Sequence, residues 1–72
     1  MKTLQTLTAV IYPGDTGRWL VAYNPETGTT SQGRTIPEAL TNLKEATALY
    51  LEECPVTIHG RPLLTTFDLA HA

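Results

Sequence analysis

Hydrophobic and polar positions alternate along the first part of the chain, which is the pattern of half-buried strands. Residues 4–12 and 18–23 both follow it and are rich in β-branched and aromatic side chains. The intervening residues 13–17 contain Pro, Asp and two Gly, so they predict a loop and hence an antiparallel hairpin. A second turn at 24–28 leads to residues 29–33, which predict a short third strand.

A different periodicity begins after Gly33 and predicts a helix. Thr35 is followed by Glu38 at the spacing of a capping box, and Pro37 falls in the first turn, where a missing N–H costs nothing. Pro55 disfavours helix at the residue before it, so the helix is expected to be about 18 residues long. The apolar stripe recurs at spacings of three and four: Ile36, Leu40, Leu43, Thr47 and Tyr50, flanked by Ala39 and Ala46.

Residues 63–69 alternate again and predict a fourth strand after the helix. The expected fold is therefore α+β, in the order β-β-β-α-β, with one helix on one face of a mostly antiparallel sheet. A sheet order of 3-2-1-4 with a right-handed crossover satisfies the connection rules. The other sheet face has no internal cover, and it carries either Trp19, Val21 and Tyr23 or Leu20 and Ala22.

Length and composition narrow the class of protein. The 72 residues make a single domain spanning 1–72, whose small core favours a homo-oligomer. Cys54 is the only cysteine, which excludes an internal disulfide and fits the reducing cytoplasm. The net charge is −2, and the five basic residues are scattered, which argues against direct DNA binding. No apolar run is long enough for a membrane span.

The polar side chains show no catalytic or metal-binding arrangement. A two-metal nuclease needs acidic residues clustered on adjacent strands, but the first strand has neither Asp nor Glu. His59, His71 and Cys54 lack the spacing of metal ligands, and no cofactor motif is present. The chain is therefore not expected to be an enzyme.

One stretch resembles a known family. It comprises Pro25-Glu26, Gly28, Ser31-Gln32-Gly33 and the helix start Glu38-Ala39-Leu40 with its continuation to Ala46. This pattern is similar to that of the HicB-like family, in its short, single-domain form. The resemblance implies a partial ribonuclease H-like β-β-β-α-β fold without that enzyme's carboxylates, and residues 63–69 as the family's final strand.

The resemblance also implies a function. HicB-like proteins are antitoxins of type II toxin–antitoxin pairs, which bind and neutralise HicA-like toxins, small RNA-cleaving proteins. Longer members carry a C-terminal DNA-binding segment, which this chain is expected to lack. The expected function is thus protein binding, with Trp19, Tyr23, Glu26 and Arg34 as partner-interface candidates. The alternative is a stand-alone oligomeric module that binds RNA or regulates without a cognate toxin, using Trp19, Tyr12 and Tyr23 to stack on bases.

Overall fold

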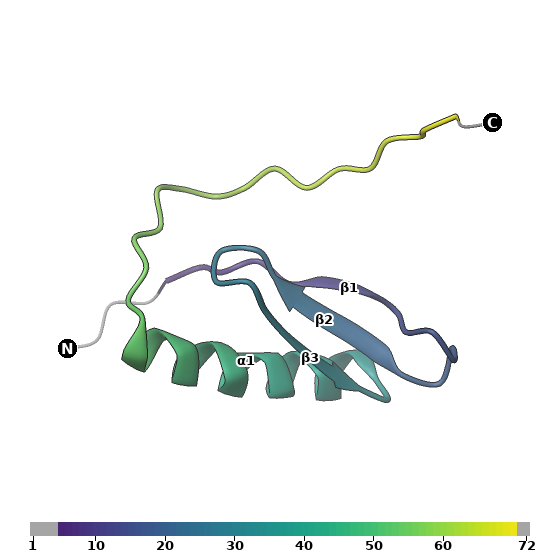
Figure 1. The fold of residues 1–72 in the computed structure, drawn as a ribbon, viewed down its shortest axis with the longest axis horizontal. Coiled ribbons are helices and arrows are strands. Elements are labelled where there is room, and N and C mark those ends of the chain that lie inside the picture. The colour runs from purple at the N-terminus through teal and green to yellow at the C-terminus, as the bar shows by residue number, and fades with distance from the viewer. Residues whose placement is uncertain (1–4, 71–72) are drawn as a thin grey trace.

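The structure, a computed structural model, describes residues 5–70 and consists of one sheet and one helix (Figure 1). The strands are β1 (Val10–Pro13), β2 (Leu20–Asn24) and β3 (Thr29–Gly33), and the helix is α1 (Ile36–Glu53). The sheet is antiparallel in the order β1-β2-β3, with α1 against one face. The predicted α+β class is confirmed, as are the hairpin, the short third strand and the helix.

The register of the sheet decides which side chains face α1. Ile11, Ala22 and Ser31 lie opposite one another across the three strands and occupy the helix-facing side. Tyr12, Val21 and Gln32 form the next row, on the opposite side. Of the two sets left open by the sequence, Leu20 and Ala22 therefore face the helix, and Val21 and Tyr23 face outward.

The first strand is shorter than predicted and is shifted towards the loop. It begins at Val10, which pairs with Tyr23, whereas the alternation predicted a strand over 4–12, of which Leu4 lies outside the described residues. The backbone ladder stops at this point because the chain opposite continues into Pro25, which has no N–H to donate. Side chains of the β2–β3 turn hold the residues before Val10 instead.

The helix begins where the capping pattern places it. Thr35 adopts an extended N-cap conformation, and its hydroxyl accepts a hydrogen bond from the Glu38 N–H at 3.2 Å. The Glu38 carboxylate reaches back to the backbone N–H of Arg34 at 3.0 Å, one residue before the position typical of a capping box. The helix ends with Cys54 as its C-cap, directly before Pro55.

The buried stripe of α1 differs from the predicted one. Its buried residues are Ala39, Leu43 and Thr47, whereas Ile36 is 53% exposed and Tyr50 is 37% exposed. The reason is a close backbone approach at Gly33, where an added Cβ would lie 2.5 Å from the Ala39 nitrogen. The first turn of the helix thus rests directly on β3, and the helix is rotated so that its smallest side chain faces the sheet.

The predicted fourth strand does not form. Residues 63–69 form no strand and run as an extended segment alongside the sheet but apart from it (Figure 1). The sheet order 3-2-1 therefore agrees with the prediction, but the place beside β1 is not filled by this chain's own segment. α1 packs mainly against β3 and, to a smaller extent, against β2. The helix therefore covers the β1 side of the sheet less than the β3 side.

We expect Gly33→Ala to destabilise the protein by about 1–3 kcal/mol, because the new methyl group would overlap the backbone of α1. Urea denaturation followed by circular dichroism would measure the loss. Thr30→Ala, at an exposed position in the same strand, is the control and should change stability by less than about 0.5 kcal/mol. Equal stability of Gly33→Ala and the wild type would contradict the close helix–strand contact.

Candidate protein-interaction surface

Glu26 is held inside a polar network at the β2–β3 turn. Its carboxylate accepts hydrogen bonds from the Thr8 backbone N–H at 2.8 Å and from the Thr8 hydroxyl at 2.7 Å. The Asn24 side-chain amide donates to the same carboxylate and to the Thr8 carbonyl, both at 2.7 Å. Glu26 thus fastens the residues before β1 to the turn.

The pKa of Glu26 reflects this environment. Desolvation by burial is the largest single influence and raises the pKa of the carboxyl group. The hydrogen bonds from Thr8, together with those from the Glu26 backbone and Asn24, outweigh it and bring the pKa below its ordinary value. The folded state therefore favours the ionised form of Glu26.

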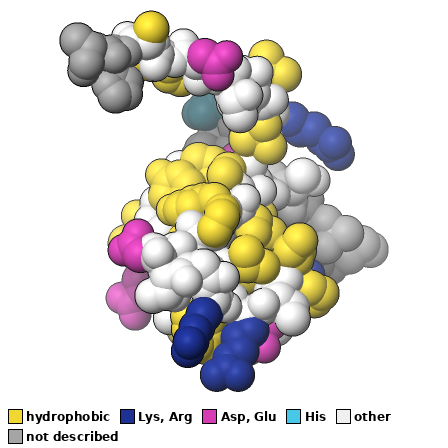
Figure 2. Space-filling view, turned by 90° about the vertical axis from the view of Figure 1, so that its right-hand side faces the viewer, with side chains coloured by type: hydrophobic (Ala, Val, Ile, Leu, Met, Phe, Trp, Pro, Cys, Tyr) yellow, Lys and Arg dark blue, Asp and Glu magenta, His cyan; other side chains and the backbone are white. Residues whose placement is uncertain are grey.

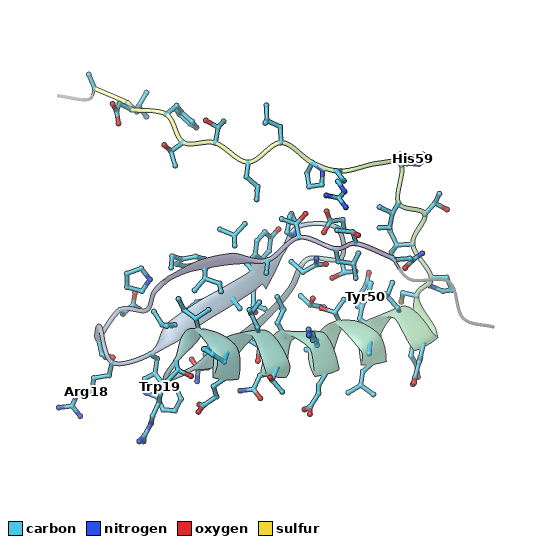
Figure 3. All side chains as sticks on the ribbon, turned by 180° about the vertical axis from the view of Figure 1, so that it is seen from behind. Arg18, Trp19, Tyr50 and His59 are labelled. Carbon is cyan, nitrogen blue, oxygen red and sulfur yellow. The ribbon has the colours of Figure 1, made fainter. Side chains whose placement is uncertain are left out.

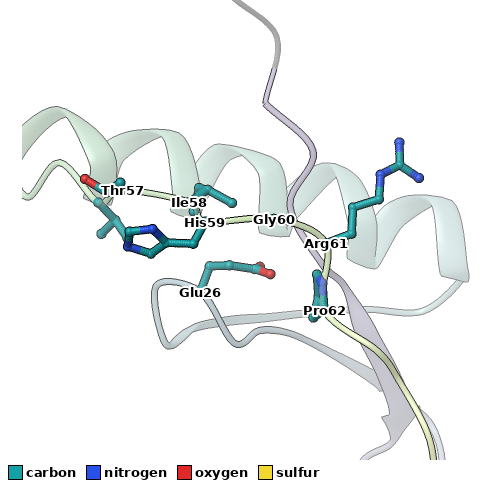
Figure 4. A pocket seen from close by; sticks show the side chains of 8 residues that line it. Glu26, Thr57, Ile58, His59, Gly60, Arg61 and Pro62 are labelled. Atoms are coloured by element: carbon teal, nitrogen blue, oxygen red, sulfur yellow. The ribbon is translucent and has the colours of Figure 1, made fainter.

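A hollow of about 440 Å³ lies between this turn and the residues that follow α1 (Figure 4). Its lining combines Glu26 with residues 56–62, including His59 and Arg61. The Glu26 carboxylate is already occupied by Thr8 and Asn24. This hollow therefore offers no free carboxylate for a partner.

The opposite end carries a tryptophan between two arginines. Arg18 and Trp19 lie there in the β1–β2 loop, far from Tyr50 and His59 (Figure 3). The Arg34 guanidinium carbon is 5.2 Å from the centre of the Trp19 ring, a cation–π contact between the loop and the β3–α1 junction. Arg18, Trp19 and Arg34 together line a hollow of about 360 Å³.

The outward sheet face continues from this tryptophan. Tyr12, Val21 and Gln32 form a cross-strand row, and with Trp19 and the loop after β1 they line a second hollow of about 440 Å³. Figure 2 shows hydrophobic side chains gathered on this end of the molecule with basic side chains at their lower rim. We use the term exposed-sheet surface for five residues: Tyr12, Trp19, Val21, Tyr23 and Arg34.

The four predicted interface residues do not form one cluster. Trp19 and Arg34 are brought together, whereas half-buried Tyr23 lies further along β2 between Val10 and Thr30. Tyr23 is four positions after Trp19, or roughly 13 Å along an extended chain. Glu26 is at the far end of the strand and is engaged internally, so the structure gives it no place in the exposed-sheet surface.

Arg18 is the functional candidate that the sequence analysis missed. In the sequence Arg18 is one of the scattered basic residues, because it lies 16 positions before Arg34. The hairpin register brings them together, since Leu20 of β2 pairs with Gly33 of β3 and the arginines lie just beyond that pair. The available signal was that the two arginines lie at the same end of the predicted hairpin, since Arg18 begins the strand 18–23 and Arg34 directly follows the strand 29–33.

Comparisons with known proteins give no relative: no family model matches the chain, and neither the curated proteins nor the solved structures yielded a match. The resemblance to HicB-like proteins therefore stays a prediction. In the part of the chain that the structure describes, no helix has the length and hydrophobicity to cross a membrane. Among the same residues, which exclude His71, no three His, Cys, Asp or Glu side chains lie close enough together to hold a metal ion.

We expect stability to fall in acid through Glu26. Because the pKa of this group is lower in the folded state, its contribution is complete above the unfolded-state pKa and is lost as the pH drops through the folded-state pKa. Glu26→Gln should cost about 1–3 kcal/mol at neutral pH and should flatten the fall in stability below it. Urea midpoints measured across the acid range would test this.

The control for this experiment is Glu45→Gln, which removes the same charge from an exposed position on α1. This variant should keep the wild-type dependence of stability on pH. A Glu26→Gln protein that loses stability in acid as steeply as the wild type would show that the network at the β2–β3 turn does not control acid unfolding.

Proposed function

We propose that this chain is a protein-interaction domain that binds a second protein through the exposed-sheet surface. The observation that carries the proposal is the stacked pair of Trp19 and Arg34 beside exposed Tyr12. Trp, Tyr and Arg are the residues that most often anchor protein interfaces, because they bury a large area and retain a polar contact. These groups bind by packing and charge, so we assign the chain a binding function and not an enzymatic one.

The partner that we propose is a HicA-like, RNA-cleaving toxin, which would make the chain a type II antitoxin. Two features support this choice. The first is the resemblance of the stretch from Pro25 to Ala46 to HicB-like proteins. The second is charge: the net charge is −2, and α1 presents a group of exposed carboxylates to solvent, namely Glu38, Glu45, Glu52 and Glu53. A toxin that binds RNA has a basic surface, which the net acidic charge of the chain attracts during encounter, whereas the contact itself forms on the other side of the sheet from these carboxylates.

The alternative function is a stand-alone module that binds single-stranded RNA. The arginines beside Trp19 favour it, since they could contact phosphates while the ring stacks on a base. Against it, Arg34 lies over the Trp19 ring, which leaves less of that ring for a base. The same stacking arrangement suits a protein interface, so we place RNA binding second.

We also propose that the protein acts in the cytoplasm as a homo-oligomer. Cys54 is a free, exposed thiol, which fits a reducing compartment. The buried hydrophobic core of the described residues consists of Ala22, Ala39 and Leu43, which is small for a stable independent domain. Contacts between copies would add the missing buried area.

Trp19 is the only tryptophan in the chain, so its fluorescence reports directly on the proposed site. We expect a saturable change when the protein is titrated with a catalytically inactive HicA-like protein encoded in the neighbouring reading frame. A single-stranded RNA oligonucleotide should cause no such change. Arg34→Ala should weaken toxin binding at least about fivefold, as expected for an interface anchor.

Arg61→Ala is the matched control, because it removes the same side chain and charge from an exposed position in the segment after α1, away from the exposed-sheet surface. It should keep the wild-type affinity for the toxin. In cells, co-expression of the wild-type chain should restore growth inhibited by the active toxin. A fluorescence change with RNA but not with the toxin, together with failure to restore growth, would replace the antitoxin proposal with the RNA-binding module.

A further inference from the structure

The segment of residues 63–69 is strongly apolar and is exposed. Its large hydrophobic side chains have exposed fractions of 89% for Leu63, 58% for Leu64, 85% for Phe67 and 75% for Leu69. Within residues 5–70, no hydrogen bond joins this segment to the sheet or the helix. A radius of gyration of 14.1 Å, against about 11 Å for a compact chain of this length, reflects the projecting segment. Such a segment is not expected to remain in water without a partner.

The sheet has an open edge at β1 and a hollow close to it, where a further strand could add. Within the described residues β1 pairs with β2 alone, so its outer edge has unpaired backbone groups. Next to that edge, on the helix side, lies a hollow of about 390 Å³. Its apolar lining comes from Leu7 and Ala9 before β1 and from Leu40 and Leu43 on α1.

We propose that residues 63–69 of one copy add as a fourth strand to the outer edge of β1 in a second copy, and that the second copy returns its own segment in the same way. The alternation of the segment places Leu63, Thr65, Phe67 and Leu69 on one side. In a strand beside β1, that side faces the hollow and fills it. The result is a closed, two-fold symmetric dimer made by exchange of an identical element.

The residues that follow α1 explain why the acceptor is a second copy. Val56 and Ile58 are half-buried where residues 56–61 lie against the β2–β3 turn and against Gln5 and Thr6. Residues 56–61 thus form a linker that lies against the body of its own copy. Pro62 then holds the preceding residue in an extended conformation. The chain continues as an extended segment that runs along the sheet but apart from it (Figure 1). With the linker held in this place, residues 63–69 stand apart from the edge of their own β1, and a second copy can accept the segment as it stands.

The test uses the full-length chain in two isotopic forms, one labelled with ¹⁵N and ¹³C and the other unlabelled, mixed after unfolding and refolding. Sedimentation at micromolar concentration should give twice the 7.9 kDa of one chain. Isotope-filtered nuclear Overhauser spectra should then connect the Phe67 ring of one copy with the Leu40 and Leu43 methyl groups of the other. Contacts of Phe67 with these residues within a single copy, or a species that stays at one chain's mass, would overturn the proposal.

Two variants separate strand exchange from association through the exposed-sheet surface. Phe67→Asp places a charge on the side of the segment that faces the hollow and should weaken the dimer at least about tenfold. Thr66→Asp makes the same change on the opposite side and should alter the dimer affinity by no more than about twofold. A dimer of unchanged affinity in Phe67→Asp would also overturn the proposal. This inference does not depend on the proposed antitoxin function.

Discussion

Asn24 is the side chain on which the arrangement of the other elements depends. It is 1% exposed at the end of β2, and its amide donates to the Thr8 carbonyl while its oxygen accepts from Thr27. Through Thr27 and Thr29, the hydrogen-bond chain continues to the Thr47 hydroxyl on α1. One buried amide thus connects the segment before β1, the turn, β3 and the helix. In a core with so few large apolar side chains, such a satisfied network specifies the fold more than hydrophobic area does.

A second constraint, the contact between Gly33 and Ala39, sets where the helix lies and what it leaves open. Since the first turn of α1 rests on the β3 backbone, the helix covers the β3 and β2 side of the sheet. The β1 side keeps an open edge and a hollow for the same reason. The contact between Gly33 and Ala39 therefore also leaves open the edge and the hollow in which we place residues 63–69 of a second copy.

Local signals in the sequence predicted the elements well, and longer-range contacts account for the errors. The Thr35 cap, Pro55 and the turn residues act within a few positions, so the helix and the hairpin could be predicted. The shift of β1 could not be predicted, because it depends on Pro25 lying opposite the residues before Val10 in the formed hairpin. Ile36 and Tyr50 fit the helical period but are exposed, since the approach of Gly33 to Ala39 chose a narrower face. The alternation of residues 63–69 predicted a strand that the chain does not form, because an alternating pattern does not specify a partner edge for the backbone.

In the candidate site, too, local patterns could be predicted from the sequence and long-range contacts could not. The alternation of Trp19 and Tyr23 identified the outward sheet face once the register was known, but the pairing of Arg34 with Trp19 depends on three strands in register. A fourth strand beside β1 would extend the sheet in its own plane and would widen the exposed-sheet surface without covering it. Tyr12 lies on the strand at that edge, so it would move from the rim of the surface to its interior. Self-association at one edge and partner binding on the outward face are therefore compatible, and the first would enlarge the area available to the second.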